Sequence, residues 1–390
     1  MDGRNLKIRL ISDIDSFISF EESWNNFLEQ CVNNDFFLSY NWFKTFFSTQ
    51  RFSGNLRILV FEEGGRILGA APLVKDRGTI RTPGGWKIPI SANKIHFIAD
   101  DLAPRCDFPV IDNPEPALTK IAEYLASISS EWEIIAFRQI PDSSPNLPVL
   151  KRIFDRFNLD TIITDDSICP YRVFNHSDPQ SKSQMIYPSS ARQERLINKG
   201  LRELKKKGKV EIKTSRNGDL SILESHIAEI EYESWKRKQK RRLFSNDMAE
   251  FTSMLMKSAA VSDQLFVILL YFNEIPIAYN LGFIYKNKYY SYSSAYKERF
   301  AHYKPGYILH REVVRIMDNM NLEEHDFLMG DSRYKRSFCN NVRQNHLIRV
   351  FNSHPASRTL FTIFRGIRPL YKQFKKSLFP ARNGDSSKYL

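Results

Sequence analysis

The chain of 390 residues lacks the features that define several protein classes. Its four cysteines, Cys31, Cys106, Cys169 and Cys339, are scattered, and this spacing fits neither a zinc site nor a disulfide framework. None of the eight histidines has the paired spacing of metal ligands, so we expect no bound metal. No apolar run reaches the roughly 18 residues of a membrane-spanning helix, and no apolar signal segment follows Met1. We therefore expect a cytoplasmic protein.

Acidic residues are sparse in the second half of the chain. Residues 1–150 carry 15 Lys and Arg against 19 Asp and Glu, a net charge of −4, whereas residues 151–390 carry 42 against 25, a net charge of +17. A basic surface of this kind attracts anionic partners. The difference predicts that the two halves have different tasks.

The segment 264–335 carries most of the information about fold. Residues 265–271 (LFVILLY), 275–285 and 288–295 (KYYSYSSA) are apolar or alternating runs of strand length, separated by short polar turns. They predict two consecutive hairpins.

A helix and a further strand follow these hairpins. Pro305 disfavours helix at the residue before it, and apolar residues then recur at helical spacing, which predicts a helix over residues 306–319. Such a helix N-terminus is a ready site for a phosphate. Residues 326–329 (DFLM) are expected to form a short buried strand, and Asp331 and Lys335 follow at its C-terminal end, where ligands collect in open α/β sheets.

Two stretches resemble a known family. Residues 295–309 (AYKERFAHYKPGYIL) and 325–335 (HDFLMGDSRYK) resemble the Fem-like branch of the GNAT acyltransferases, and are most similar to the subgroup found beside bacterial exopolysaccharide and cellulose synthesis systems. In that subgroup a Tyr-x-x-Tyr-x-Pro-Gly-x-x-Leu pattern precedes the cofactor helix, and Gly-Asp-x-x-Tyr-Lys follows the next strand. The resemblance covers about residues 187–349, and the ordinary GNAT signature Arg/Gln-x-x-Gly-x-Gly/Ala is absent from the sequence.

The resemblance and the order of elements predict an α/β (α+β) protein with tandem GNAT-like lobes, each a mixed, mostly antiparallel sheet flanked by helices. The N-terminal half shows the same order as the second half: helices, a strand meander, another helix and another strand. We place the N-terminal lobe at residues 1–175, the acyltransferase lobe at 186–352 and a basic amphipathic tail at 353–390.

The resemblance implies acetyl-CoA or another acyl-CoA as the donor. The CoA phosphates are expected at the N-terminus of the predicted helix, and the thioester carbonyl is expected to accept a hydrogen bond from the backbone of the strand before it. The predicted donor-binding residues are Ser293, Ser294, Arg299, Lys304, Gly306, Tyr307 and Ile308.

Amine acylation also needs a group that takes the proton of the acceptor and a group that protonates the leaving thiolate. Asp331 is the candidate general base, a role that requires burial or a water relay because an ordinary Asp is a weak base. Its alternative role is capping of the following helix. Tyr334 has a phenol that could donate to the thiolate. Trp235, Lys236 and Lys335 are the candidate acceptor-binding residues, although Lys335 could instead pair with Asp331.

Three basic segments have a structural and a functional interpretation each. Residues 190–208 predict a helix capped by Ser190 and decorated with Lys and Arg, and residues 236–242 (KRKQKRR) are denser. Both could be solvated faces or surfaces for an anionic substrate. Between Arg358 and Phe379 there are six Lys and Arg and no acid on an amphipathic pattern, with a kink expected at Pro369. This helix could pack on the protein or contact an anionic membrane surface.

Three functions therefore compete. The leading hypothesis is an acyl-CoA-dependent N-acyltransferase that acts on an amino sugar or related amine, including nucleotide- or lipid-linked forms, in bacterial surface polysaccharide synthesis. The second is a Fem-type transferase that takes its aminoacyl donor from tRNA. The third is a non-catalytic, membrane-associated scaffold with a GNAT fold.

Overall fold

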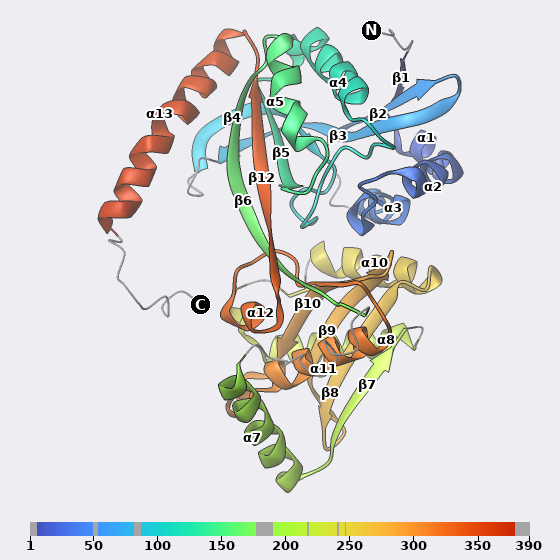
Figure 1. The fold of residues 1–390 in the computed structure, drawn as a ribbon, viewed down its shortest axis with the longest axis vertical. Coiled ribbons are helices and arrows are strands. Elements are labelled where there is room, and N and C mark those ends of the chain that lie inside the picture. Colours follow the sequence, from blue (N-terminus) through green and yellow to red (C-terminus); the bar gives the residue numbers. More distant parts are fainter. Residues whose placement is uncertain are drawn as a thin grey trace.

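Figure 1 shows the fold in a computed structural model of the chain. The structure describes residues 6–49, 54–81, 87–176, 190–216, 218–239, 242–245 and 247–378, and for residues 81, 87–89, 247 and 367–378 only the backbone.

Twelve described strands form one sheet, in the order β1-β2-β3-β4-β5-β12-β6-β11-β10-β9-β8-β7. Their bounds are β1 Lys7–Ile11, β2 Asn55–Glu63, β3 Arg66–Arg81, β4 Lys87–Phe97, β5 Ile134–Pro141, β6 Asp160–Val173, β7 Val210–Ser215, β8 Leu265–Phe272, β9 Ile275–Tyr285, β10 Lys288–Tyr296, β11 Glu324–Asp326 and β12 Asn341–Phe351.

The helices lie on both faces of this sheet (Figure 1). Their bounds are α1 Ile14–Ile18, α2 Glu21–Gln30, η1 Phe36–Leu38, α3 Tyr40–Phe47, α4 Glu115–Ser127, η2 Ser129–Glu131, α5 Leu147–Arg156, α7 Ala191–Lys207, α8 Leu220–Tyr232, α9 Trp235–Gln239, α10 Asp247–Val261, η3 Glu298–Tyr303, α11 Pro305–Asn319, α12 Arg333–Phe338 and α13 Pro355–Leu378.

The two halves of the chain repeat one another. Each contains a strand, a group of helices, a three-strand meander, a helix, a strand, a helix and a final strand, so β1 to β6 correspond to β7 to β12. If each strand is replaced by its counterpart in the other half, the order of strands read from β1 is the same as the order read from β7. The fourth and fifth strands of each half form a parallel pair, β4 with β5 and β10 with β11, and the other pairs are antiparallel. The predicted tandem of GNAT-like lobes is confirmed.

The final strand of each half pairs with the other half. β12 lies between β5 and β6, and β6 continues past β12 to pair with β11. Figure 1 shows β6 and β12 crossing together between the upper and lower parts of the molecule. The sheet is therefore continuous, and β12, which falls within the predicted second lobe, lies among strands of the first. The division near residues 175 and 186 remains a prediction, and residues 177–189 lie outside the described part of the chain.

Helices of the first half cover part of the second half. The Phe36 ring of η1 stacks on Phe283 of β9 with centroids 4.5 Å apart, and Trp42 of α3 contacts Phe251 of α10 edge-on at 5.5 Å. The core on this face of the sheet runs through both lobes. The N-terminal lobe thus forms a wall over β9 and β10.

The predicted strands and helix at residues 265–319 are confirmed as β8, β9, β10 and α11. The strand predicted at residues 326–329 is wrong, because β11 ends at Asp326. Leu328 and Gly330 have φ angles of 56° and 108°, which turn the chain out of the strand conformation. Beyond β11 the chain follows β6, since the backbone N–H of Phe327 donates to the carbonyl of Pro170 (3.0 Å).

The first half of α13 packs on the N-terminal lobe. Leu360 and Phe364 are buried in a small cluster with Phe351 of β12. The apolar positions expected beyond residue 366, and the kink expected at Pro369, lie outside the described side chains. Among the helices that the structure describes, none is long and apolar enough to cross a membrane.

Candidate active site

The candidate site lies where β10 and β11 diverge. The two parallel strands are paired over three residue pairs that end at Tyr290 and Asp326. The register of β10 against β9 then shifts between Tyr290 and Ser293. Backbone groups of β10 beyond this point no longer belong to the β10–β11 ladder, so they are the part of the strand that could bind a ligand carbonyl.

Adjacent serines of β10 face opposite sides of the sheet. Ser293 Oγ lies on the α8 side, 2.9 Å from the phenol oxygen of Tyr279, and accepts a hydrogen bond from the ammonium group of Lys236. Ser294 Oγ lies on the α11 side, 3.3 Å from Nε2 of His310. Each predicted serine thus belongs to a different side-chain cluster.

The cluster on the α8 side is centred on a buried carboxylate. Glu231, the penultimate residue of α8, is fully buried; its Oε1 accepts hydrogen bonds from Lys236 Nζ (2.9 Å) and the Tyr279 phenol (2.6 Å). Its Oε2 accepts one from the backbone N–H of Leu243 (2.6 Å). Burial lowers the pKa of Lys236, an effect that Glu231 opposes, and burial together with Glu231 raises the pKa of Tyr279 well above its usual value.

Lys236 therefore lies beside β10 in the candidate site, and its role in acceptor binding remains a prediction. The sequence analysis did not name Glu231. A signal for it exists in the sequence: Glu231 follows Ile227 by four residues, which places a carboxylate on the apolar face of the helix. A charged residue on a buried stripe needs a partner, and here the partner is Lys236.

The cluster on the α11 side contains a neutral histidine and a protonated tyrosine. The Tyr334 ring of α12 lies 4.9 Å from the His310 ring at 36°, and its phenol hydrogen-bonds with Ser294. Burial raises the pKa of Tyr334 to about 12 and lowers the pKa of His310 to about 3. Tyr334 therefore keeps its phenol proton at neutral pH, as its predicted role requires. Tyr334 also raises the pKa of Tyr279 electrostatically, so the two clusters are within range of one another.

The N-terminus of α11 offers unused backbone donors. The helix starts at Pro305 after Lys304, which adopts the left-handed conformation with φ 59°, and the first-turn N–H groups of Gly306 and Tyr307 have no acceptor within the helix. The N–H of Ile308 donates to the carbonyl of Lys304 (3.1 Å). Of the three predicted phosphate-binding amides, Gly306 and Tyr307 are thus available and Ile308 is not.

The side chains around this turn differ in availability. Lys304 is exposed, whereas Arg299 pairs with Glu233 (3.1 Å). A Cβ at Gly306 would lie 3.1 Å from the Tyr296 ring, so the backbone of the turn approaches β10 closely. Of the two residues predicted to neutralise the CoA phosphates, Lys304 and Arg299, Lys304 is therefore the more available.

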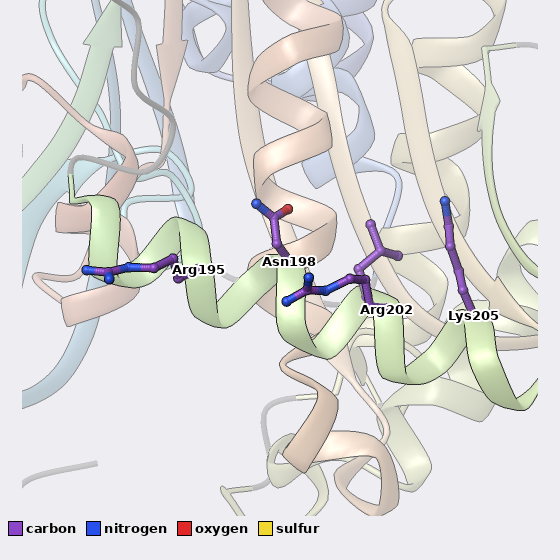
Figure 2. Close-up of a pocket in the computed structure, with 5 residues that line it drawn as sticks. Arg195, Asn198, Arg202 and Lys205 are labelled. Carbon is purple, nitrogen blue, oxygen red and sulfur yellow. The ribbon is translucent and has the colours of Figure 1, made fainter.

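Helix α7 places a basic groove next to this turn. The groove has a volume of about 430 Å³ and is lined by Arg195, Asn198, Leu201, Arg202 and Lys205 (Figure 2). α7 packs on η3 and α11, since Lys207 Nζ donates to the Tyr303 phenol (2.7 Å) and Arg311 donates to Asn198 (2.7 Å). Arg195, Arg202 and Lys205 are exposed, so the basic residues predicted at 190–208 fit both a solvated face and a surface for an anion.

Comparison with known proteins identifies the lobe that carries these clusters. Residues 191–336 match the family model described as "Acetyltransferase (GNAT) domain". This region of the C-terminal lobe is therefore similar to a GNAT acetyltransferase domain, and we call it the GNAT domain. The matched residues include α7, the β10–β11 divergence, α11 and Tyr334.

Solved structures share the fold over most of the chain. The structure titled "Crystal structure of FemX" is 10% identical with a TM-score of 0.55, and the match covers 88% of this chain and 96% of that chain. A conserved protein of unknown function from Bacteroides thetaiotaomicron is 9% identical with a TM-score of 0.52, covering 89% of this chain and 100% of that one. At these identities the likeness concerns fold alone. No curated protein is significantly similar in sequence.

Two predicted residues of the GNAT domain have other partners than expected. The Asp331 side chain is 42% exposed, and its carboxylate accepts hydrogen bonds from Arg336, which holds its pKa below the usual value. The burial that a general base would require is therefore not observed. Lys335 Nζ donates to the carbonyls of Leu328 (3.2 Å) and Met329 (2.5 Å) and does not reach Asp331 within ion-pair distance. Burial lowers the pKa of Lys335 to about 8.

Trp235, the third predicted acceptor-binding residue, is half-buried at the start of α9. The side chains of the basic run at residues 236–242 lie in different environments. Lys236 is turned inward, whereas Arg237 lies over the Tyr232 ring at 4.4 Å and Lys238 pairs with Glu298 (3.0 Å). Lys240 and Arg241 lie outside the described residues.

A buried ion cluster joins the N-terminal lobe to the GNAT domain beside the divergence. Arg105 donates to Asp35 (2.5 Å) and to Asp326 of β11. Arg343 of β12 donates to Asp326 (2.8 Å) and to Glu324 (3.2 Å). Asp326 is fully buried. The end of β11 is thus fixed by arginines from the N-terminal lobe and from β12.

The corresponding divergence in the N-terminal lobe is filled by its own chain. β4 and β5 are also paired at three positions only. Beyond them the backbone N–H of Cys106 donates to the carbonyl of Gln139 (3.0 Å), and the buried Phe108 packs between Phe97 and Phe137 at 4.9 and 5.0 Å. The loop that follows β4 therefore occupies the position that would receive a ligand.

The described residues contain no group of three or more His, Cys, Asp or Glu side chains that could hold a metal ion.

Proposed function

We propose that this protein is an acyl-CoA-dependent N-acyltransferase whose acceptor is the amine of an amino sugar or a related compound, in bacterial cell-surface polysaccharide synthesis. The observation that supports this best is the β10–β11 divergence, which has a proton donor, Tyr334, on the α11 face and a buried polar cluster on the α8 face. An amine acylation needs chemistry on both sides of the thioester carbonyl, because the acceptor must lose a proton and the thiolate must gain one.

The donor is proposed to bind along α11. The available N–H groups of Gly306 and Tyr307, the exposed Lys304 and the basic groove of α7 suit the diphosphate and the further phosphate of a coenzyme A. Backbone N–H groups of β10 beyond Tyr290 would polarise the thioester carbonyl without reorganisation during the reaction.

The acceptor is proposed to enter from the α8 side, between the GNAT domain and the N-terminal lobe. Trp235 and Lys236 belong to this side, and Lys335 supports the loop after β11. A peripheral contact of α13 with a membrane, which would suit a lipid-linked acceptor, and a cytoplasmic location remain predictions.

The same experiment also tests two alternative functions. A tRNA-dependent aminoacyl transferase of Fem type is favoured by the basic second half of the chain, with a net charge of +17 over residues 151–390. A non-catalytic scaffold would need neither donor. Thermal unfolding with CoA and with tRNA separates the three, because a ligand at 100 times its Kd stabilises the folded state by about 2.7 kcal/mol. A rise in Tm with CoA alone supports the proposal, a rise with tRNA alone supports the Fem-type function, and no rise with either rejects both.

A further inference from the structure

The cluster on the α8 side forms a continuous chain of hydroxyl groups that ends at a buried carboxylate. Ser293 is partly exposed at the β10 divergence. Its Oγ lies 2.9 Å from the Tyr279 oxygen, which lies 2.6 Å from Glu231 Oε1. Tyr279 and Glu231 are both fully buried. A proton that enters at Ser293 can therefore reach Glu231 through two short hydrogen bonds.

We propose that Ser293, Tyr279 and Glu231 form the proton relay that deprotonates the acceptor ammonium, with Glu231 as the terminal base. This inference rests on the proposed function and assigns the base to the α8 cluster instead of to the exposed Asp331.

The proton balance of the relay is complete. The acceptor ammonium gives a proton to Ser293 Oγ as the hydroxyl proton of Ser293 passes to Tyr279 and the phenol proton of Tyr279 passes to Glu231, which becomes a carboxylic acid. The free amine then attacks the thioester carbon, the C–N bond forms, and the C–S bond breaks with its electron pair on sulfur. The second proton lost from nitrogen goes to the thiolate by way of Tyr334, and Glu231 later releases its proton to solvent.

Lys236 positions the three relay side chains and stabilises the negative charge of Glu231. Its ammonium group donates to all three relay side chains, including Glu231 Oε1 at 2.9 Å and the Tyr279 oxygen at 2.7 Å. The positive charge stabilises Glu231 as a carboxylate in a buried place, where an unpaired one would be neutralised. Across the β10 divergence the facing titratable group is Tyr334, which stays protonated.

The test compares two acceptors that differ in their need for a base. Hydroxylamine is largely neutral at pH 7 and small enough to reach the site without specific contacts, whereas D-glucosamine is largely protonated there. CoA release from acetyl-CoA is measured with each amine over a range of pH for the wild type, Glu231→Gln and Tyr279→Phe. The second variant removes only a hydroxyl group, so it is informative even if Glu231→Gln disturbs the contact with Leu243.

The relay predicts a loss of at most about tenfold in kcat/KM for D-glucosamine at pH 7 in both variants, because a fraction of this amine is already neutral there. It also predicts that activity returns as pH rises toward the pKa of the amine, and that the rate with hydroxylamine is nearly unchanged. Glu229→Gln is the matched control on the same helix: it removes the ion pair with the buried Lys297 but lies outside the relay, and both rates should stay at the wild-type level.

Two results would overturn the relay. Equal losses with both amines, with no return at high pH, would mean that the cluster only supports the structure, and the proposed function would stand without it. If the wild type releases CoA with neither amine and CoA does not raise its Tm, acyl-CoA-dependent N-acylation itself is rejected, and the relay falls with it.

Discussion

Replacement of Arg105 by Met should strongly destabilise the contact between the two lobes. The guanidinium group is buried and donates to Asp35 and to Asp326, which belong to different lobes. Two charge-assisted hydrogen bonds at about 1.5–3 kcal/mol each give a loss of roughly 3–6 kcal/mol. This range agrees with the 3–5 kcal/mol typical of breaking a buried ion pair. Against a total stability of about 5–15 kcal/mol the loss is large.

The remaining contacts of the two acids place the loss toward the lower end of this range. Asp326 keeps Arg343 (2.8 Å) and the backbone N–H of Leu328 (2.7 Å), and Asp35 keeps the Tyr290 phenol (3.3 Å). We therefore expect Arg105→Met to lower the free energy of unfolding by about 3 kcal/mol.

Urea unfolding at pH 7 measures this change, with Asp326→Asn and the double variant to complete a thermodynamic cycle. The coupling energy should be about 1–3 kcal/mol. Arg156→Met is the control, because its ion pair with Glu115 is on the surface and should contribute nothing measurable. A loss below about 1 kcal/mol for Arg105→Met, or additive single variants, would show that the cluster does not join the lobes energetically.

Three further predictions concern the donor site, Asp331 and pH. Gly306→Asp should weaken CoA binding measured by calorimetry at least tenfold more than Gly306→Ala does, because both add a Cβ near β10 but only Asp adds a negative charge; equal effects would move the phosphate site elsewhere. Asp331→Asn should leave kcat within about threefold of wild type, since an exposed, ion-paired carboxylate with a lowered pKa is a poor base; a loss of about 10² or more would restore Asp331 as the general base. His96 is buried, which lowers its pKa, but hydrogen bonds to Asp100 and Asp76 outweigh burial and raise the pKa from 6.5 to about 9. The folded pKa is the higher one, so the stabilisation, on the order of 3 kcal/mol, is fully present below pH ~6.5 and is lost as pH rises toward 9. Wild type and His96→Gln should therefore differ most in urea stability at pH 6 and least above pH 9, and a difference that does not change with pH would contradict this assignment.

The elements that the sequence predicted well are those whose side chains face one environment along their whole length. β8 and α11 belong to this class, because β8 is buried over seven of its eight residues and α11 has a regular apolar stripe. Because each of these elements packs against one core, the spacing of its apolar residues predicts its secondary structure correctly.

The two central strands were not predicted, and the reason is physical. β6 (DTIITDDSICPYRV) is half-buried along most of its length, and β12 (NVRQNHLIRVF) carries Arg343, Asn345 and Arg349 as buried polar residues. Such strands lack the apolar runs that mark a core strand, because their polar side chains meet partners from the other lobe. Asn345, for example, donates to the Pro104 carbonyl (2.8 Å). A pattern within one segment cannot reveal partners that are more than 200 residues away.

The same limit explains why the sequence analysis named Asp331, and not Glu231, as a candidate base. The Gly-Asp-x-x-Tyr-Lys motif predicts Asp331 to lie near the site. The pKa of a carboxyl group, however, depends on its burial, and burial depends on residues far along the chain. Glu231 meets Tyr279 and Ser293 only after β9 and β10 have folded onto α8.

The N-terminal lobe, whose own divergence is filled, helps to shape the candidate site of the GNAT domain, because the final strand of each half pairs with the other half. The loop that fills the N-terminal divergence also carries Arg105, which holds Asp326 at the point where β10 and β11 separate. β6, the last strand of the N-terminal lobe, pairs with β11 on its other side and accepts the backbone bonds of the chain beyond it. β11, the second strand of the divergence, is therefore held by β10 of its own lobe on one side and by β6 of the N-terminal lobe on the other. A lobe whose own divergence is filled in this way still fixes the opening of the GNAT domain, which is a physical reason for both halves to be present in one chain.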